Sequence, residues 1–297
     1  MSRDRSASTG RTYGLARVLK AWGLPRSTFY ERRRRPLFLR PPARRGPKTR
    51  YSDEDLLAEI RRTIQESPFC GEGHLKVWVR LRVSEVRTAK RRVLRLMRKN
   101  DLLAPQRQPQ PVKPKRHDGT ILAERPNPMW GIDATVDFTQ ADGRVTIFAM
   151  MDHATAECLG THVAKRGTRF EALEPVRRAV HEQFGGFAEG IACGVRLRHD
   201  HGSQFMSDDF QSEIAFLGME SSPAFVREPE GNGCIERFLR TLKEQLLWMR
   251  DLTTLEELAA ALEEFRQRYN DHRLVERLRF QSPQQARQRL LGLEAAA

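Results

Sequence analysis

The sequence predicts an α/β domain with a mixed sheet, preceded by small all-helical modules. Between residues 130 and 138, apolar side chains alternate with Asp133, Thr135 and Asp137, which is the period of a half-buried strand. Apolar strand patterns at about 144–151, 158–164 and 195–198 follow, interleaved with helical patterns at about 170–184 and 208–217. Before residue 105 the apolar residues recur at helical spacing instead.

Charge divides the chain into two unlike parts. Residues 1–120 hold 31 of the 52 Lys and Arg but only 11 of the 38 Asp and Glu, so they carry +20 of charge and the remainder −6. A basic part favours a polyanion partner such as nucleic acid. We therefore expect five segments: a helix-turn-helix-like segment at 1–35, a basic linker at 36–50, a helical DNA-binding module at 51–104, a Pro-rich linker at 105–124, and an α/β core with C-terminal helices at 125–290.

The composition also excludes several classes of protein. No apolar run approaches the ~18 residues that a membrane span requires, and the start lacks the apolar segment of a signal peptide. The four cysteines are scattered and form neither a zinc pattern nor a disulfide framework. We expect a soluble protein of the cytoplasm with no membrane partner.

Residues 13–31 are typical of a helix-turn-helix. Leu15 and Leu19 share one helical face, Gly23 marks a turn, and Pro25 suits the first turn of a second helix. That second helix would present to DNA the side chains of Arg26, Ser27 and Thr28. The alternative is a small helical hairpin that touches no DNA.

A second basic helical module is expected at 51–104. One helix begins at Asp53, a second covers about 74–81, and Ser84 caps a third that runs to about Lys99. The third helix displays a row of cations with no interleaved acid, and the candidates for DNA contact are Arg87, Lys90, Arg91 and Arg95. The alternative is a solvated basic face.

The helix predicted after Gly231 is expected to supply residues of a functional site. Its apolar residues recur at helical spacing and should face a core: Ile235, Leu239, Leu242, Leu246 and Met249. Glu236, Arg240 and Lys243 share a more polar face, where a carboxylate one turn below two cations suits a site at which metal ions meet phosphate. We expect Arg240 and Lys243 to bind DNA, with simple solvation as the alternative.

Two further aspartates are candidate partners of Glu236. Asp133 lies on the first strand and Asp200 at the end of a later strand, and 35 residues separate Asp200 from Glu236. Asp137 shares the strand face of Asp133, and Asp152 ends the adjacent strand, so both are alternative ligands. His199 and His201 flank Asp200 and could contact DNA, orient the carboxylate or pack.

An ordered set of motifs resembles the integrase core of bacterial transposases. The motifs are Trp130-x-x-Asp133-x-Thr135, Asp200-x-Gly-Ser-Gln-Phe205, Gly231-Asn-Gly, Glu236-Arg-Phe-x-x-Thr-Leu-Lys243, and Tyr269-Asn270 with Pro283. The resemblance covers about 55–290 and is greatest to the second-frame protein of the insertion-sequence family numbered three. Many relatives have Ser where this chain has His199, and a longer segment before the glutamate.

This resemblance implies a ribonuclease-H-like fold, with a mixed five-stranded sheet and flanking helices. It further implies a DDE triad of Asp133, Asp200 and Glu236 that holds two Mg²⁺ or Mn²⁺ ions, of which Asp133 bridges both. The implied activity is 3′-end nicking and strand transfer on double-stranded DNA, at element ends and target. The implied protein acts as a homo-multimer at the nucleoid and is completed by an upstream-frame transposase protein. The alternatives are a non-enzymatic DNA-binding regulator and a nuclease without strand transfer.

Overall fold

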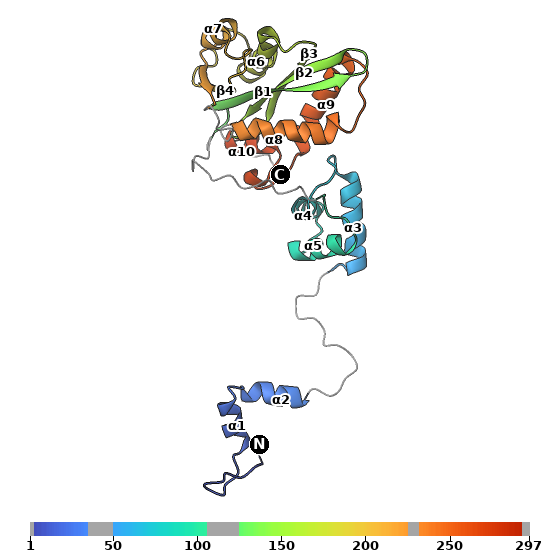
Figure 1. Cartoon of the computed structure of the whole chain (residues 1–297), viewed down its shortest axis with the longest axis vertical. Coiled ribbons are helices and arrows are strands. Elements are labelled where there is room, and N and C mark those ends of the chain that lie inside the picture. Colours follow the sequence, from blue (N-terminus) through green and yellow to red (C-terminus); the bar gives the residue numbers. More distant parts are fainter. Residues whose placement is uncertain (1–2, 35–49, 106–124, 225–231, 293–297) are drawn as a thin grey trace. The chain divides into compact units, whose positions relative to one another are not determined.

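The computed structural model describes residues 3–34, 50–105, 125–224 and 232–292. The chain divides into two compact units, residues 1–50 and residues 51–297 (Figure 1). The smaller unit contains α1 (Leu15–Ala21) and α2 (Arg26–Arg34), which confirms the two expected helices. Gly23 turns the chain between them with a φ of +62°, and the N–H of Leu24 donates to the carbonyl of Leu19 at 2.9 Å.

The larger unit begins with a three-helix module. It consists of α3 (Asp53–Glu66), α4 (His74–Val83) and α5 (Lys90–Lys99). A capping box between Ser52 and Asp55 starts α3. The three helices enclose one apolar core, formed by Leu56, Ile60, Val77, Leu81, Val86, Val93, Leu96 and Met97.

The expected start of the third helix is wrong. Ser84 ends α4, and α5 begins only after Ala89. Glu85 adopts a left-handed conformation with a φ of +60°, which stops helical hydrogen bonding, and the N–H of Val86 returns to the carbonyl of Leu81 at 2.8 Å. Val86 is nevertheless buried, so this residue of the loop between α4 and α5 packs into the core without being part of a helix.

The α/β half of the larger unit is built on one mixed sheet of five strands. These are β1 (Met129–Thr139), β2 (Gly143–Asp152), β3 (Cys158–Ala164), β4 (Arg196–His199) and β5 (Glu220–Pro223), in the order β3-β2-β1-β4-β5. β2 pairs antiparallel with β1 and β3, whereas β4 runs parallel to β1 and β5. The predicted five-stranded mixed sheet is confirmed. The segment that supplies β5, Glu-Ser-Ser-Pro, carries none of the β-branched or aromatic residues that would have indicated a strand.

Helices cover both faces of this sheet (Figure 1). One face packs against α6 (Arg169–Phe184) and α7 (Asp208–Phe216) around Trp130, Ile132, Phe148 and Leu197. The other face packs against α8 (Gly233–Leu242) and α9 (Leu255–His272), with α10 (Pro283–Leu290) beside α9. A π-helical turn, Lys243–Leu247, extends α8, and a 3₁₀ turn, Glu276–Leu278, precedes α10. This architecture is the ribonuclease-H-like fold that was expected.

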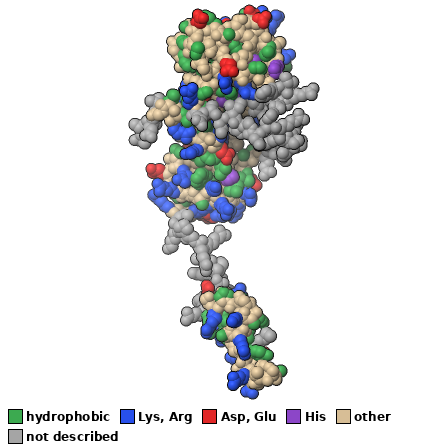
Figure 2. All heavy atoms as spheres, turned by 90° about the vertical axis from the view of Figure 1, so that its left-hand side faces the viewer, with side chains coloured by type: hydrophobic (Ala, Val, Ile, Leu, Met, Phe, Trp, Pro, Cys, Tyr) green, Lys and Arg blue, Asp and Glu red, His purple; other side chains and the backbone are tan. Residues whose placement is uncertain are grey.

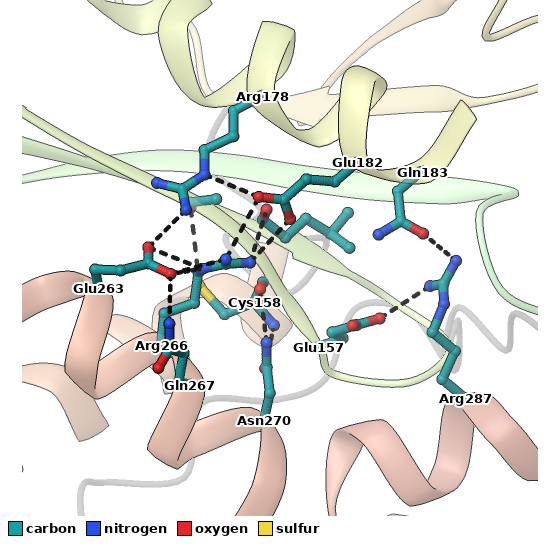
Figure 3. Close-up of polar contacts among 12 residues, drawn as sticks. Glu157, Cys158, Arg178, Glu182, Gln183, Glu263, Arg266, Gln267, Asn270 and Arg287 are labelled. Atoms are coloured by element: carbon teal, nitrogen blue, oxygen red, sulfur yellow. Dashed lines mark hydrogen bonds and ion pairs between the residues drawn. The ribbon is translucent and has the colours of Figure 1, made fainter. Parts of the chain in front are cut away.

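Polar contacts fix α9 and α10 to the sheet edge (Figure 3). The side-chain amide of Asn270 accepts from the N–H of Cys158 at 2.8 Å and donates to its carbonyl at 2.9 Å, like an added strand. Arg266 forms ion pairs with Glu182 at 3.0 Å and Glu263 at 2.9 Å. The C-terminal helices are therefore part of the α/β half of the larger unit, as the expected segment 125–290 implies.

The three-helix module contacts the α/β half through the loop between α3 and α4. Phe69 is buried in the same apolar cluster as α8 and α9. The side chain of Gln245, in the π-helical turn, accepts from the N–H of Cys70 at 2.8 Å and donates to its carbonyl at 3.0 Å. A boundary at residue 104 stays a prediction, because residues 51–297 form one compact unit.

Candidate active site

Asp133 lies on the middle strand, on the face covered by α8. Side chains alternate along a strand, and Trp130 and Ile132 point into the core beneath α6 and α7. Gly131 and Asp133 therefore point to the opposite face, where Ala149 is the cross-strand partner of Asp133 and belongs to the cluster packed against α8. The carboxylate of Asp133 is half-buried at this position.

Asp200 follows directly after β4, the strand that pairs with β1. In the parallel ladder Gly131 is the partner of Arg198, and Asp133 and Asp200 each lie two residues beyond that pair. Asp200 is near enough for its charge to raise the pKa of Asp133. The N–H of Gly202 donates to Oδ1 of Asp200 at 2.8 Å. Nδ1 of His199 donates to the backbone carbonyl oxygen of Asp200 at 2.7 Å. The backbone at the strand end thus holds this exposed carboxylate in place.

The two flanking histidines shape the loop. His199 is buried, packs against Phe205, and its Nε2 bonds Oγ of Ser221 at 2.9 Å. Burial lowers the pKa of His199, which favours the neutral ring. Nε2 of His201 donates to the carbonyl of Ala224 at 2.7 Å. Of the expected alternatives, the structure favours packing and orientation of the Asp200 loop.

Glu236 comes from the first turn of α8 and is exposed. The helix is seated on the sheet by its buried residues, which include Ile235, Phe238, Leu239 and Leu242. Met249 is 60% exposed, so the predicted apolar face ends one turn earlier than expected. The chain departs from regular α-helical geometry at the π-helical turn, which rotates the later residues off the core-facing stripe.

The alternative ligand Asp152 has a structural role. It is fully buried, and its oxygens accept from the N–H of Asn127 at 2.7 Å and the N–H of Thr155 at 2.8 Å. These bonds close the turn that follows β2. Asp137 is half-buried four residues beyond Asp133, and burial raises its pKa.

The charges of the other two candidate carboxylates both reach Asp133. Burial, with a smaller contribution from the negative charges of Asp200 and Glu236, raises the pKa of Asp133 to about 6. A hydrogen bond from the N–H of Ala134, at 2.7 Å, and the charge of Lys243 act in the opposite direction but are outweighed. Partial burial also raises the pKa of Glu236.

The three carboxylates lie in the same region of the structure but do not meet at one point. Among the described residues, no three His, Cys, Asp or Glu side chains come together closely enough to hold a metal ion. Carboxylate oxygens are nevertheless the donors that hard divalent cations prefer. A cation beside Asp133 would also relieve the repulsion that raises its pKa. The donor set therefore fits such an ion, and its ligands would have to draw together around it.

The residues predicted to contact DNA are mostly exposed. Figure 2 shows Lys and Arg side chains around the three-helix module, where Arg87, Lys90 and Arg91 are exposed. Arg95 forms an ion pair with Asp53 at 2.7 Å. In the smaller unit the side chains of Arg26 and Ser27 are exposed and that of Thr28 is half-buried.

Arg240 of α8 and Lys243 of the π-helical turn differ in setting. Arg240 pairs with Glu244 at 3.1 Å, whereas Lys243 lies near enough to Asp133 and Asp137 for its charge to oppose the rise in the pKa of both. Their DNA contacts, like those of the two helical modules, stay predictions.

Three polar residues beside Asp133 escaped the sequence interpretation. They are His153, Arg198 and Asn232, all buried. Arg198 lies in a short strand of sequence Arg-Leu-Arg-His, which gave no signal that its side chain is buried. Asn232 belongs to the Gly231-Asn-Gly motif, but its burial beside Gly131 was not expected, and nothing in the local pattern marked His153.

None of the described helices is both long enough and apolar enough to cross a membrane.

Families and individual proteins of known type are similar to this chain. Two integrase core domain families match, one over residues 123–229 and the other over 217–283. The chain is 28% identical over 251 residues to the transposase InsD of insertion element IS2A/D/F/H/I/K from Escherichia coli, covering 81% of each chain. To the InsD transposase of insertion element IS2-9 from the same species it is 27% identical, covering 81% of this chain and 79% of the relative.

Solved structures of retroviral proteins are also similar. A chain of the simian T-cell lymphotropic virus intasome is 18% identical, with a TM-score of 0.45, covering 73% of this chain and 70% of that one. The HTLV-2 integrase catalytic core domain in complex with magnesium is 16% identical, with a TM-score of 0.42, covering 55% and 97%.

The two integrase-core matches together span the whole sheet and α8, and the insertion-element transposases align with four fifths of the sequence. The chain belongs to the insertion-sequence transposases of the DDE integrase-core superfamily, and is a DNA transposase of the polynucleotidyl-transferase type.

Proposed function

We propose that this transposase nicks the ends of an insertion sequence to expose a 3′-hydroxyl and joins that hydroxyl to a second DNA strand, using Asp133, Asp200 and Glu236. One observation supports this assignment above the others. The three carboxylates come from a strand, a strand end and a helix, yet the charges of Asp200 and Glu236 both act on Asp133. Acidic groups that repel each other in one place are typical of functional sites.

The same three residues would hold two Mg²⁺ or Mn²⁺ ions. Bound there, the ions would supply positive charge to the phosphodiester and lower the pKa of the attacking hydroxyl or water. No side chain of the protein is needed as a nucleophile. The described carboxylates stand apart before any ion is bound, so we propose that the site closes when metal and DNA phosphate arrive together.

The chain positions its own ligands for this. Asp133 is fixed by the sheet, and the Ala134 N–H at 2.7 Å orients its carboxylate. Asp200 is held by the N–H of Gly202 at 2.8 Å, and the core-facing residues of α8 keep Glu236 on the sheet face. Lys243 places a positive charge near Asp133, where a DNA phosphate would be attracted.

The proposed partner is double-stranded DNA, both the element ends and the target. Arg26, Ser27 and Thr28 would contact it from the smaller unit. From the larger unit the proposed contacts are Arg87, Lys90, Arg91, Arg95, Arg240 and Lys243. We further propose that the protein works as a homo-multimer on DNA, in the cytoplasm at the nucleoid, and that an upstream-frame protein completes it.

The proposal is tested with labelled duplexes made from the DNA that flanks the coding region of this chain. The full-length protein is incubated with them in Mg²⁺ or Mn²⁺, and nicked and joined strands are separated on a denaturing gel. Glu236→Gln should bind the duplex as the wild type does but produce neither product, because it removes one negative ligand without changing size. Glu256→Gln, an exposed acid in the first turn of α9, is the matched control and should retain both products.

Equal nicking by Glu236→Gln and the wild type would overturn the catalytic assignment. Nicking without joined strands would identify a nuclease rather than a transposase. Binding by both proteins with no product from either would instead support a DNA-binding regulator.

A further inference from the structure

Buried polar atoms without partners gather beside the candidate active site. In the described part of the chain, Nε of Arg198, Nε2 of His153 and Oδ1 of Asn232 are enclosed and have no hydrogen-bond partner. The three residues are only 8%, 7% and 5% exposed. Buried polar groups in native proteins are nearly always satisfied, so three orphans in one place indicate that something else binds there.

All three border Gly131, on the sheet face of Asp133. A Cβ on Gly131 would lie 2.8 Å from Nε2 of His153 and 3.0 Å from Oδ1 of Asn232. Arg198 is the partner of Gly131 in the parallel ladder, and its neighbour on β4 points into the opposite core. Since residues two apart on a strand are separated by about 7 Å, this cluster stands next to Asp133.

Arg198 gives this cluster a positive charge that no ion pair compensates among the described residues. A guanidinium stays charged at every physiological pH, and Arg198 forms no ion pair with any carboxylate of the described residues. Arg277 brings a second guanidinium, which donates to the carbonyl oxygens of His153 at 2.8 Å and Ala154 at 3.2 Å. Burial, together with both arginine charges, lowers the pKa of His153 to about 4, so the ring is a neutral hydrogen-bonding group.

We propose that Arg198 and His153 form a phosphate-binding site that takes a backbone phosphate of the DNA strand held at Asp133, close to the phosphodiester that reacts. The inference rests on the proposed function, since it requires DNA at the carboxylates. A guanidinium fork matches two phosphate oxygens, and an imidazole N–H can donate to one of them. Successive phosphates of a strand are spaced 3.4 Å along the helix axis. When one phosphate lies at Asp133, a neighbouring phosphate can therefore lie within the distance of about 7 Å that separates Asp133 from Gly131.

Arg196 supplies a matched control on the same strand. It lies two residues before Arg198 and therefore on the same face, but it is exposed and pairs with Glu220 at 2.8 Å. Its charge is already compensated, so its removal should leave phosphate recognition unchanged.

The test replaces single phosphates with neutral methylphosphonates, one at a time, on either side of the nick site of the same flanking duplexes. Binding is measured by fluorescence anisotropy with EDTA present, so no chemistry intervenes. We expect one position at which the replacement weakens wild-type binding about tenfold or more. Arg198→Gln should lose the same factor on unmodified DNA and lose nothing further at that position. Its binding should also depend less steeply on salt, by about one ion.

Control variants separate recognition from folding. Arg198→Lys keeps the charge and should keep the sensitivity to that methylphosphonate, and Arg196→Gln should behave as the wild type at every position. His153→Gln, which removes the ring but leaves Arg198, should reduce the sensitivity at the same position. If Arg198→Gln fails to fold, the wild-type scan and His153→Gln still decide the question.

The proposal is overturned if no methylphosphonate near the nick site weakens wild-type binding. It is equally overturned if Arg198→Gln and each methylphosphonate weaken binding independently, because Arg198 would then contact none of the replaced phosphates. If the protein nicks DNA but Arg198→Gln and the methylphosphonates act independently, the proposed function stands and only the phosphate site is rejected. A protein that binds without nicking loses the proposed function, whereas the anisotropy result still stands.

Discussion

Asp133 occupies a position where a carboxylate is costly to keep charged. Burial and two neighbouring acids raise its pKa to about 6, from an ordinary value of 3.8. In the absence of a cation the folded protein therefore holds a proton on Asp133 more tightly than the unfolded chain does. Stability contributed by this group is fully present below pH 4 and is lost as the pH rises towards and beyond 6.

This loss can be measured with Asp133→Asn, which removes the charge and keeps the shape. In metal-free buffer at pH 8 the variant should be more stable than the wild type, by on the order of 2–3 kcal/mol. The advantage should disappear at pH 4, where the wild-type carboxyl is protonated. Thermal unfolding at both pH values checks this, with the exposed Asp251→Asn as control. An advantage that is equal at both pH values would show that charge is not its cause.

Magnesium should reverse the effect on the wild type. A cation among the carboxylates favours their charged forms, so Mg²⁺ or Mn²⁺ should raise the melting temperature of the wild type at pH 8 and that of Asp133→Asn much less. The wild-type response should weaken below pH 6, because protons then compete for Asp133. An equal response in both proteins would place the bound ion elsewhere.

Gly131 makes room for the polar cluster beside Asp133. A methyl group there would press on the buried ring of His153 at 2.8 Å, and that ring cannot swing into solvent. Gly131→Ala should therefore destabilise the protein by about 1–3 kcal/mol and reduce nicking. Gly233→Ala is the matched control, since a Cβ at Gly233 meets nothing within 4 Å. Urea unfolding that leaves Gly131→Ala unchanged would mean that His153 has space to move.

At the scale of elements, the cations of α5 fall into two groups. Arg92 and Arg95 both hold Asp53 at the start of α3, at 2.8 Å and 2.7 Å, and lower its pKa. Lys90 and Arg91 are exposed on the same helix. The row of cations that looked uniform in the sequence thus includes members that join two helices.

Neutralising the two groups should have different consequences. Lys90→Gln and Arg91→Gln should each reduce the salt dependence of DNA binding by about one ion and leave the melting temperature unchanged. Arg92→Gln should lower the melting temperature slightly, because an ion pair at a partly exposed site contributes less than about 1 kcal/mol. Salt titrations of duplex binding check the first part. Unchanged salt slopes for Lys90→Gln and Arg91→Gln would mean that this face does not meet DNA.

Elements with strong periodicity were predictable, and those shaped by tertiary context were not. The alternation in β1 and the helical spacing in α6 and α7 each predicted the observed element to within a few residues. β5 forms because its backbone pairs with β4, whatever its side chains are, so Glu220–Pro223 carried no signal. The start of α5 depends on the left-handed Glu85, a conformation that non-glycine residues rarely announce in sequence.

For the whole molecule, the sheet is what assembles the site. β1 and β4 are adjacent although about sixty residues separate them, and their parallel pairing brings Asp200 near enough to act on the charge of Asp133. The sequence motifs marked the three candidate acids: Asp133 lies within a recognisable strand, Asp200 follows one, and Glu236 lies in the first turn of a helix. It did not indicate that His153, Arg198 and Asn232 would meet around Gly131, since that contact depends on long-range packing.

The central claim is that Asp133, Asp200 and Glu236 act as one unit in cutting DNA, and nicking rates of a set of variants test it most directly. Asp133→Asn, Asp200→Asn and Glu236→Gln should each reduce nicking about a thousandfold or more, and a double variant should be no worse than either single one. Asp137→Asn, on the same strand face, should stay within about threefold of the wild type, because an acid outside the unit adds little. Nicking that survives any of the three single changes, or that fails equally in Asp137→Asn, would contradict the account.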